Sequence, residues 1–176
     1  YTPPTPPERT ADRGSSVNFV QKADVNQSTI YMGHPGEITR RSDDYAAVTI
    51  MNEALSGGFS GRLFQTARKE KGLAYSVSGN YSTGYQQPGR SFAGVFSQSA
   101  RTVEAATAVM EEVHGMKTDP PTAEELSLAK ESYLNSFVFN FDTEQEVLSR
   151  RMTDAYHDYP ADFLQQTRTA IENVST

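Results

Sequence analysis

The spacing of hydrophobic and polar positions changes several times along the chain, and each change predicts an element of secondary structure. Residues 17–22 and 28–33 are short apolar stretches bounded by turn residues, which predicts two strands. In residues 43–56 the apolar positions recur every three to four residues, which predicts a largely buried helix. Gly57 and Gly58 then end this helix.

A second helix and a third strand are predicted directly afterwards. Ser60 is the expected N-cap of a helix over residues 61–71, and Gly72 suits the left-handed conformation that ends helices. From residue 73 the pattern changes to a period of two, which predicts a strand. One face of this strand is expected to carry Leu73, Tyr75, Val77 and Tyr81.

The next strand, over residues 91–98, is expected to return antiparallel beside it after a turn at 84–89. The order of strands, helices, a hairpin and more helices predicts an α+β fold. The expected architecture is a two-layer sandwich, a mostly antiparallel sheet with helices covering one face.

The remainder of the chain is predicted to be helical. Residues 102–116 form one helix, and Thr122 with Glu125 forms a capping box that starts the next. Asp142 is the expected cap of a further helix, and the last helix covers residues 161–172. The inward positions of the helix after Asp142 are expected to be Leu148, Met152 and Ala155.

Composition narrows the functional classes. The chain has 176 residues, 36% of them hydrophobic, which fits one domain with a sizeable core. A net charge of −6 with scattered basic residues argues against nucleic-acid binding. The lack of cysteine excludes disulfides and thiolate metal sites, and no apolar stretch approaches the roughly 20 residues of a membrane-spanning helix.

The start of the chain has a different composition. Residues 1–16 are rich in proline and polar residues, which predicts an extended linker before a domain over residues 17–176. Because the first residue is Tyr1 and not methionine, the chain is interpreted as a piece of a longer precursor.

The sequence contains no motif of neighbouring residues that would bind a metal ion or a phosphate group. His34, His114 and His157 are far apart, and none has the histidine and acid neighbours of a zinc-binding helix. The glycines at 57, 58 and 61 are not followed by the Gly-Lys-Ser/Thr of a phosphate loop, so a tight turn is expected there. No metal site is predicted on this chain.

Two strong hydrogen-bond donors are expected to converge near one corner. Arg68 lies at the end of the helix over 61–71, and Tyr75 lies near the start of the following strand, seven residues later across a tight reversal. Considered alone, Arg68 could be a surface arginine at a helix end, and Tyr75 could be a core aromatic.

The residues around this pair resemble a known family. Residues 57–64, Gly-Gly-Phe-Ser-Gly-Arg-Leu-Phe, and 68–77, Arg-Lys-Glu-Lys-Gly-Leu-Ala-Tyr-Ser-Val, resemble the pitrilysin, insulinase and mitochondrial processing peptidase family of inverted-motif zinc peptidases. The resemblance is to the second, zinc-free half of these enzymes. It continues through residues 121–126 and 156–163, so it covers the chain from about residue 17.

The resemblance implies an enzyme of two homologous halves that close around an extended peptide. The other half, in the same polypeptide or a partner subunit, would bind zinc through a His-x-x-Glu-His helix and activate water there. This half would contribute Arg68 and Tyr75 to the substrate, with Gly57, Gly58, Phe59 and Ser60 lining the site. An arginine fork and a tyrosine hydroxyl both suit a carbonyl oxygen that becomes an oxyanion.

Two departures from the family pattern are visible. Gly61 stands where family members often have serine, and the chain ends at Thr176, before the last helix and strand that the family would supply. A domain truncated there is expected to expose a sheet edge.

The sequence is compatible with three functional classes to different degrees. The first is the substrate-binding half of a metallopeptidase, inactive alone. The second is a non-proteolytic scaffold or interaction domain of the same fold. The third, an independent small-molecule enzyme, has no nucleophile, metal ligands or phosphate loop to support it. Bacterial relatives of this size favour a periplasmic location, with a cytoplasmic one as the alternative.

Overall fold

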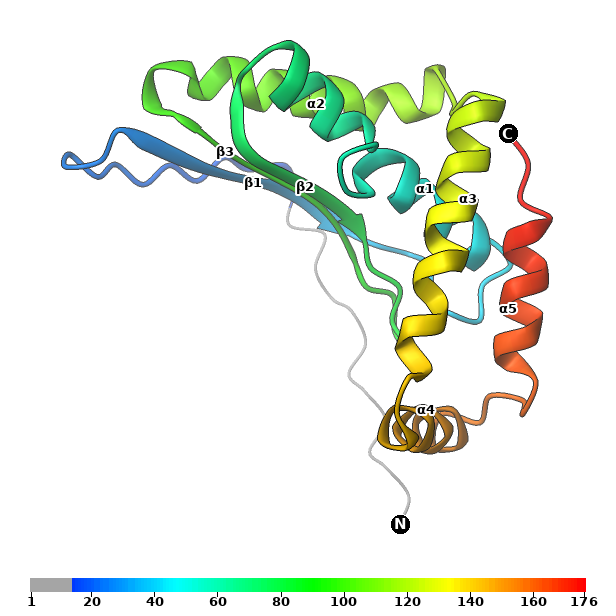
Figure 1. The fold of residues 1–176 in the computed structure, drawn as a ribbon. Helices are drawn as coiled ribbons and strands as arrows, with labels where there is room; N and C mark the ends of the chain where they lie inside the picture. Colours follow the sequence, from blue (N-terminus) through cyan, green and yellow to red (C-terminus); the bar gives the residue numbers. More distant parts are fainter. Residues whose placement is uncertain (1–13) are drawn as a thin grey trace.

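A three-stranded antiparallel sheet forms one layer of the structure (Figure 1). The computed structural model describes residues 14–176, apart from the side chain of residue 140. The strand order is β1-β3-β2, so the last strand in the sequence is the central one. The strands are β1 (Gln27–Pro35), β2 (Ala74–Tyr81) and β3 (Arg90–Gln98), which confirms three of the four predicted strands.

The predicted strand at residues 17–22 is wrong. These residues have no regular structure, and Val17, Phe19 and Val20 are each at least 80% exposed. A strand needs a neighbour for its backbone groups and a surface for its apolar side chains, and the described residues offer neither here. The predicted linker over 1–16 lies outside the described residues, except for its last three.

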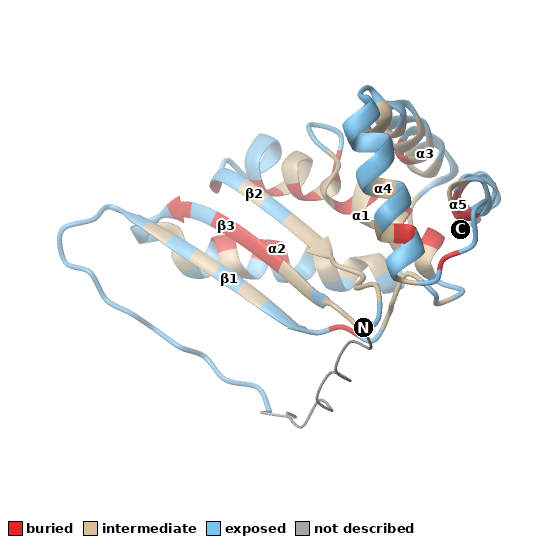
Figure 2. Cartoon of the chain, turned by 90° about the horizontal axis from the view of Figure 1, so that it is seen from below, coloured by how far each residue is buried: buried red, intermediate tan, exposed pale blue. Residues whose placement is uncertain are grey.

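Helices cover one face of the sheet, which confirms the predicted two-layer α+β architecture (Figures 1 and 2). The core between the layers includes Leu55, Leu63, Val77, Val95 and Val109. The opposite face carries the exposed rings of Tyr31 and Phe96, packed edge to face with their centroids 6.3 Å apart. The covering helices are α1 (Tyr45–Ser56), η1 (Phe64–Glu70) and α2 (Thr102–Thr118), the last entered through the short turn η2 (Ser99–Arg101).

A second group of helices packs beside α1 at the end of the sheet (Figure 1). Its core joins Ala46, Ile50 and Ala54 of α1 to Ala129 and Ile171. The helices are α3 (Ala123–Phe137), the short turn η3 (Val138–Phe141), α4 (Glu144–Tyr156) and α5 (Phe163–Glu172).

The capping boxes place the starts of α3 and α4. The predicted box of Thr122 and Glu125 is confirmed at α3. The cap of α4 was predicted at Asp142, but it is Thr143, which forms a complete capping box with Glu146. A box satisfies two backbone N–H groups reciprocally, which a lone Asp142 would not do.

The predicted inward face of α4 is also wrong. Leu148, Met152 and Ala155 are exposed, whereas Asp154 is buried and accepts two bonds of 3.0 Å from Arg150 Nε. A carboxylate can be buried when a guanidinium pairs with it, and this pair occupies the packed side of the helix.

A tight turn joins α1 to η1. Gly58 has a φ of +56°, a conformation that costs glycine little. A Cβ at Gly61 would lie 2.7 Å from the backbone nitrogen of Gly57 and 2.8 Å from the Cα of Ser56. Ser60 was predicted to cap the helix, but its hydroxyl instead donates to the Gly57 carbonyl at 3.1 Å. The turn therefore depends on the absence of a side chain at residue 61.

Arg62 ties this turn to the start of α3. Its Nε and one terminal nitrogen donate to the two carboxylate oxygens of Glu125, both at 2.8 Å, and the other terminal nitrogen donates to the Asp119 carbonyl at 2.7 Å. The same Glu125 carboxylate accepts the Thr122 N–H of the capping box at 2.8 Å. The hydrogen bonds from Arg62 are the main cause that lowers the pKa of Glu125 to about 2.

The lowered pKa of Glu125 predicts a loss of stability in acid. Since the folded-state pKa lies below the usual 4.5, the Glu125 contribution is present above about pH 4.5 and is lost as pH falls towards about 2. Glu125→Gln is expected to reduce the free energy of unfolding at pH 7 by about 1–2 kcal/mol, allowing for partial solvent exposure, and to change little near pH 2. Urea titrations at both pH values measure this. Glu172→Gln, in an exposed pair with Arg168, is the control and should have a small effect at either pH.

The contacts at Gly61 predict a second stability effect. Gly61→Ala is expected to lower the free energy of unfolding by about 1–3 kcal/mol, because the new methyl group would overlap backbone atoms that cannot move independently. Gly115→Ala is the matched control: no atom lies within 4 Å of its Cβ position, and alanine favours a helix interior by about 0.5–1 kcal/mol. Thermal unfolding of both variants compares them; equal shifts in Tm would contradict the crowding at Gly61.

Candidate functional site

Arg68 lies on a π-helical turn whose side chains form an ordered strip. Its guanidinium carbon is 5.1 Å from the centroid of the Phe64 ring, one turn earlier in η1. The Phe64 ring packs edge to face against Phe59 at 5.0 Å. Cation–π contact limits the positions of the guanidinium while leaving the side chain exposed to solvent. π-helical turns are rare and often occur at functional sites.

Several contacts fix the backbone between Arg68 and Tyr75. Gly72 adopts the predicted left-handed conformation, with a φ of +58°. The buried Ser97 hydroxyl on β3 donates to the Leu73 carbonyl at 2.7 Å, and Arg101 donates to the Gly72 carbonyl at 3.3 Å. An ion pair of 3.5 Å joins Lys71 to Glu111 on α2. The reversal is therefore anchored to both neighbouring elements.

A β-bulge interrupts the alternation of β2 at Tyr75. Alternation predicted Tyr75 on the same face as Val77, which packs against the core. The pairing of β2 with β3 shifts between Ala74 and Ser76, so Ala74 is 9% exposed and belongs to the core, whereas Tyr75 is 53% exposed. The predicted alternation is therefore broken at this point, and Tyr75 does not pack in the core with Val77. Bulges commonly redirect a side chain in this way at the edge of a sheet.

Arg68 and Tyr75 are thus two exposed donors at the ends of one anchored turn. Within residues 14–176, no hydrogen bond is formed by the Arg68 guanidinium or the Tyr75 hydroxyl, and no ring contact joins the two. Both groups keep their donors available to a ligand. An arginine fork binds carbonyl or carboxylate oxygens, and a phenol can donate to an oxygen that gains negative charge.

The loop predicted to line the site, residues 57–60, precedes the strip of Phe59, Phe64 and Arg68. Phe59 is 77% exposed, although its carbonyl accepts a short hydrogen bond from the Gln65 side chain and its ring contacts Phe64. An exposed but ordered aromatic ring offers contact area at little entropic cost. Gly57, Gly58 and Ser60 supply the turn that holds Phe59 in place.

The sequence pattern did not point to the residues that support this site. Ser97 and Arg101 hold the reversal, and Arg62 holds the turn before η1. For Arg62 the sequence did hold one indication, because it directly precedes the buried Leu63. The stem of a long side chain at such a position lies along the edge of the core and its charged end reaches the surface. Nothing in the local pattern distinguished Ser97 from other strand serines.

The donor set of the described residues does not fit zinc. No three histidine, cysteine, aspartate or glutamate side chains gather to hold a metal ion between residues 14 and 176. His34 lies in β1, His114 lies in α2, and His157 directly follows α4.

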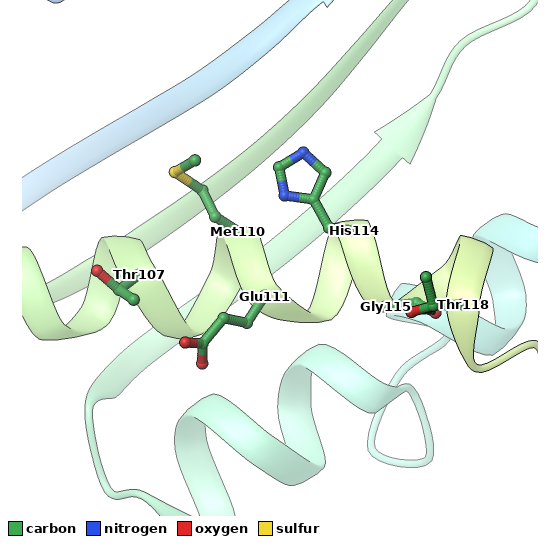
Figure 3. Close-up of a pocket in the computed structure, with 6 residues that line it drawn as sticks. All are labelled: Thr107, Met110, Glu111, His114, Gly115 and Thr118. Atoms are coloured by element: carbon green, nitrogen blue, oxygen red, sulfur yellow. Dashed lines mark hydrogen bonds between the residues drawn. The ribbon is translucent and has the colours of Figure 1, made fainter.

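A hollow of about 430 Å³ lies along α2 and is lined by residues of that helix (Figure 3). Met110 and His114 project from one side of α2 and Glu111 from the other, so its polar groups do not converge. This hollow offers no catalytic arrangement.

No described helix combines the length and the apolar character needed to cross a membrane.

Curated relatives include bacterial proteins named as zinc proteases and one named otherwise. The chain is 27% identical over 132 residues to the uncharacterized zinc protease YmxG of Bacillus subtilis, covering 75% of this chain and 32% of that protein. It is 28% identical over 162 residues to the non-peptidase homolog YmxG of Helicobacter pylori, covering 86% of this chain and 35% of that protein. The chain therefore spans about a third of the length of these two relatives.

Solved structures share the fold at lower identity. The peptidase M16 inactive domain from Pseudomonas fluorescens superposes with a TM-score of 0.76 and 21% identity, over 85% of this chain and 35% of that chain. The periplasmic protease PqqL from Escherichia coli superposes with a TM-score of 0.69 and 16% identity, over 87% of this chain and 17% of that chain.

The family model described as the peptidase M16 inactive domain matches residues 1–133, three quarters of the chain. The matched residues include the turn between α1 and η1, η1 itself, β2 with its bulge, and the start of α3. The resemblance stated from residues 57–77 is confirmed: the chain belongs to the peptidase M16 family, as its inactive domain.

Proposed function

We propose that this chain is the substrate-binding, zinc-free half of a zinc metallopeptidase. In this proposal an extended peptide lies across the turn between η1 and β2, and Arg68 and Tyr75 donate hydrogen bonds to the carbonyl at the bond to be cleaved. The observation that carries the proposal is the pair of exposed donors at the two ends of one anchored turn.

Each of the two donors has a distinct role. Arg68 can hold a peptide carbonyl or carboxylate with two nitrogens of its planar guanidinium. The Tyr75 hydroxyl would donate a hydrogen bond to the oxygen that becomes negatively charged. This hydrogen bond would be stronger in the transition state than in the bound substrate. Phe59 would provide an apolar contact to the peptide beside these donors.

The hydrolytic chemistry is assigned to a separate zinc-bearing half. The described residues contain no metal-binding group, so this chain is proposed to be inactive alone. The partner would be a half with a His-x-x-Glu-His helix, in the same polypeptide or another subunit. Relatives about three times as long as the matched region are consistent with additional domains.

A periplasmic location is part of the proposal. It is supported by the fold shared with PqqL, which is a periplasmic protease. A cytoplasmic location is the alternative.

A non-proteolytic scaffold is the second candidate function. It is favoured by the relative from Helicobacter pylori, which is named a non-peptidase homolog and which covers 86% of this chain. A scaffold would use the same surface for assembly and would not need Arg68 or Tyr75 for any reaction.

Peptide hydrolysis by the full protein, or by this domain assembled with its zinc-bearing half, separates the two candidates. Arg68→Ala is expected to lower kcat/KM by about 10- to 100-fold, since a charged donor to the substrate is lost. Tyr75→Phe is expected to lower kcat by about 10²-fold with little change in KM, as for the loss of an oxyanion donor.

The control variants are Lys69→Ala and Tyr31→Phe. They remove the neighbouring exposed charge and an exposed hydroxyl on the open sheet face, and both should leave kcat and KM unchanged. Size-exclusion chromatography checks that every variant still assembles. Unchanged hydrolysis in the Arg68 and Tyr75 variants would contradict their role, and an intact assembly without hydrolysis would favour the scaffold.

A further inference from the structure

A second concave site lies away from the 57–75 segment, among α1, α3, α4 and α5. It is a hollow of about 230 Å³, and none of its lining residues belongs to the proposed peptide site. Two guanidinium groups and four aromatic rings line it, from Arg40, Arg150, Tyr45, Tyr133, Phe137 and Phe141. No aspartate or glutamate of the described residues is part of this lining.

The Arg40 guanidinium lacks hydrogen-bond acceptors among the described residues of this site. Its Nε is buried and has no hydrogen-bond partner among residues 14–176, and no carboxylate of the same residues forms an ion pair with it. Its guanidinium carbon lies 4.2 Å from the Tyr85 ring centroid and 5.9 Å from that of Tyr45. Ring contacts stabilise the charge but accept no directed N–H bond. The Nε itself is enclosed, so the donors that a ligand in the hollow can reach are the two terminal nitrogens of Arg40, which form no hydrogen bond within residues 14–176.

Arg150 does not cancel this positive charge. Its Nε is bound to the Asp154 carboxylate, so this pair is neutral as a whole. One guanidinium charge, that of Arg40, is left over in the lining of the hollow. The site therefore suits an anion with a single negative charge.

The Tyr133 hydroxyl adds a further donor to the lining of the hollow. Burial raises the pKa of Tyr133 to about 12, so the hydroxyl stays protonated at neutral pH and can donate. The Thr167 hydroxyl already donates to the Phe163 carbonyl at 2.8 Å and can still accept a bond. The hollow thus combines unsatisfied donors with aromatic walls.

We infer that this hollow binds a monocarboxylate attached to a small apolar or aromatic group. The carboxylate would accept hydrogen bonds from Arg40 and the Tyr133 hydroxyl, and the apolar group would lie against Phe137 and Phe141. A single unpaired guanidinium matches one negative charge, and aromatic walls disfavour the strongly hydrated dianion of phosphate. The volume, below the usual range for drug-sized ligands, fits a group the size of one amino-acid side chain.

The same carboxylate chemistry has two possible sources, the C-terminus of a peptide and a free small carboxylic acid. The structure also offers a purely structural role for Arg40. His157 stacks on Tyr85 with 4.4 Å between centroids and an interplanar angle of 5°, so Arg40 and His157 occupy opposite faces of that ring. In this role Arg40 would lock the residues around 85 and 157 together and bind no ligand.

NMR titration of the ¹⁵N-labelled chain tests the inference. The probes are N-acetylphenylalanine, its amide, inorganic phosphate, and the peptide Gly-Gly-Phe with a free or an amidated C-terminus. N-acetylphenylalanine is expected to bind at least about tenfold more tightly than its amide and than phosphate, with shifts at residues 133 and 167. Tighter binding of free Gly-Gly-Phe would identify a peptide C-terminus as the source, and tighter binding of N-acetylphenylalanine a small acid.

Three variants test whether binding depends on Arg40 and Tyr133. Arg40→Gln should weaken binding of N-acetylphenylalanine by at least about tenfold, and Tyr133→Phe by about threefold or more. Arg168→Gln removes the same charge from the exposed side of α5 and should change binding less than twofold. Tyr133→Phe keeps the ring, so it remains informative if Arg40→Gln fails to fold.

Three results would overturn the inference. They are equal binding of the acid and its amide, preferred binding of phosphate, and no binding of any probe to the folded wild-type chain. In the last case a loss of stability in Arg40→Gln would assign Arg40 to the structural stack with Tyr85 and His157.

Discussion

The ion pair of Arg62 with Glu125 links the two helix groups, in addition to the apolar core that α1 shares with α3 and α5. It joins the start of η1, next to the sheet, to the first turn of α3, which packs at the end of the sheet. Glu125 is also the N3 residue of the capping box of α3, so one carboxylate both supports the start of a helix and fixes its place. The turn that carries Phe59 is therefore held from a distant part of the chain.

Local patterns predicted the parts of the fold that local rules control. The conformation of Gly72, the Thr122 capping box and the antiparallel return of β3 beside β2 are each set by nearby residues, and each was predicted correctly. The bulge at Tyr75 and the exposed apolar side of α4 depend on pairing register and on the Arg150–Asp154 pair. Such tertiary choices leave no periodic signal in the sequence.

The sequence identified residues of the candidate site, but it did not predict the contacts that hold them in position. Spacing placed Arg68 and Tyr75 on either side of a reversal, but it could not show that Ser97 and Arg101 anchor that reversal. Nor could it show that Phe64 supports the guanidinium of Arg68. These contacts join residues about 24 to 29 positions apart, or depend on π-helical winding, and a one-dimensional pattern records neither.

The strand order β1-β3-β2 has a consequence for how the sheet assembles. Both β1 and β2 pair only with β3 among the described strands, so neither has a partner until residues 90–98 are present. The β2–β3 hairpin closes a short loop, whereas pairing β1 with β3 closes the whole intervening segment that contains α1 and η1. Because loop closure costs more entropy over a longer segment, the hairpin forms more readily and offers the template on which β1 docks. During synthesis from the N-terminus, β1 therefore has no partner among the described strands until α1, η1 and β2 have been made.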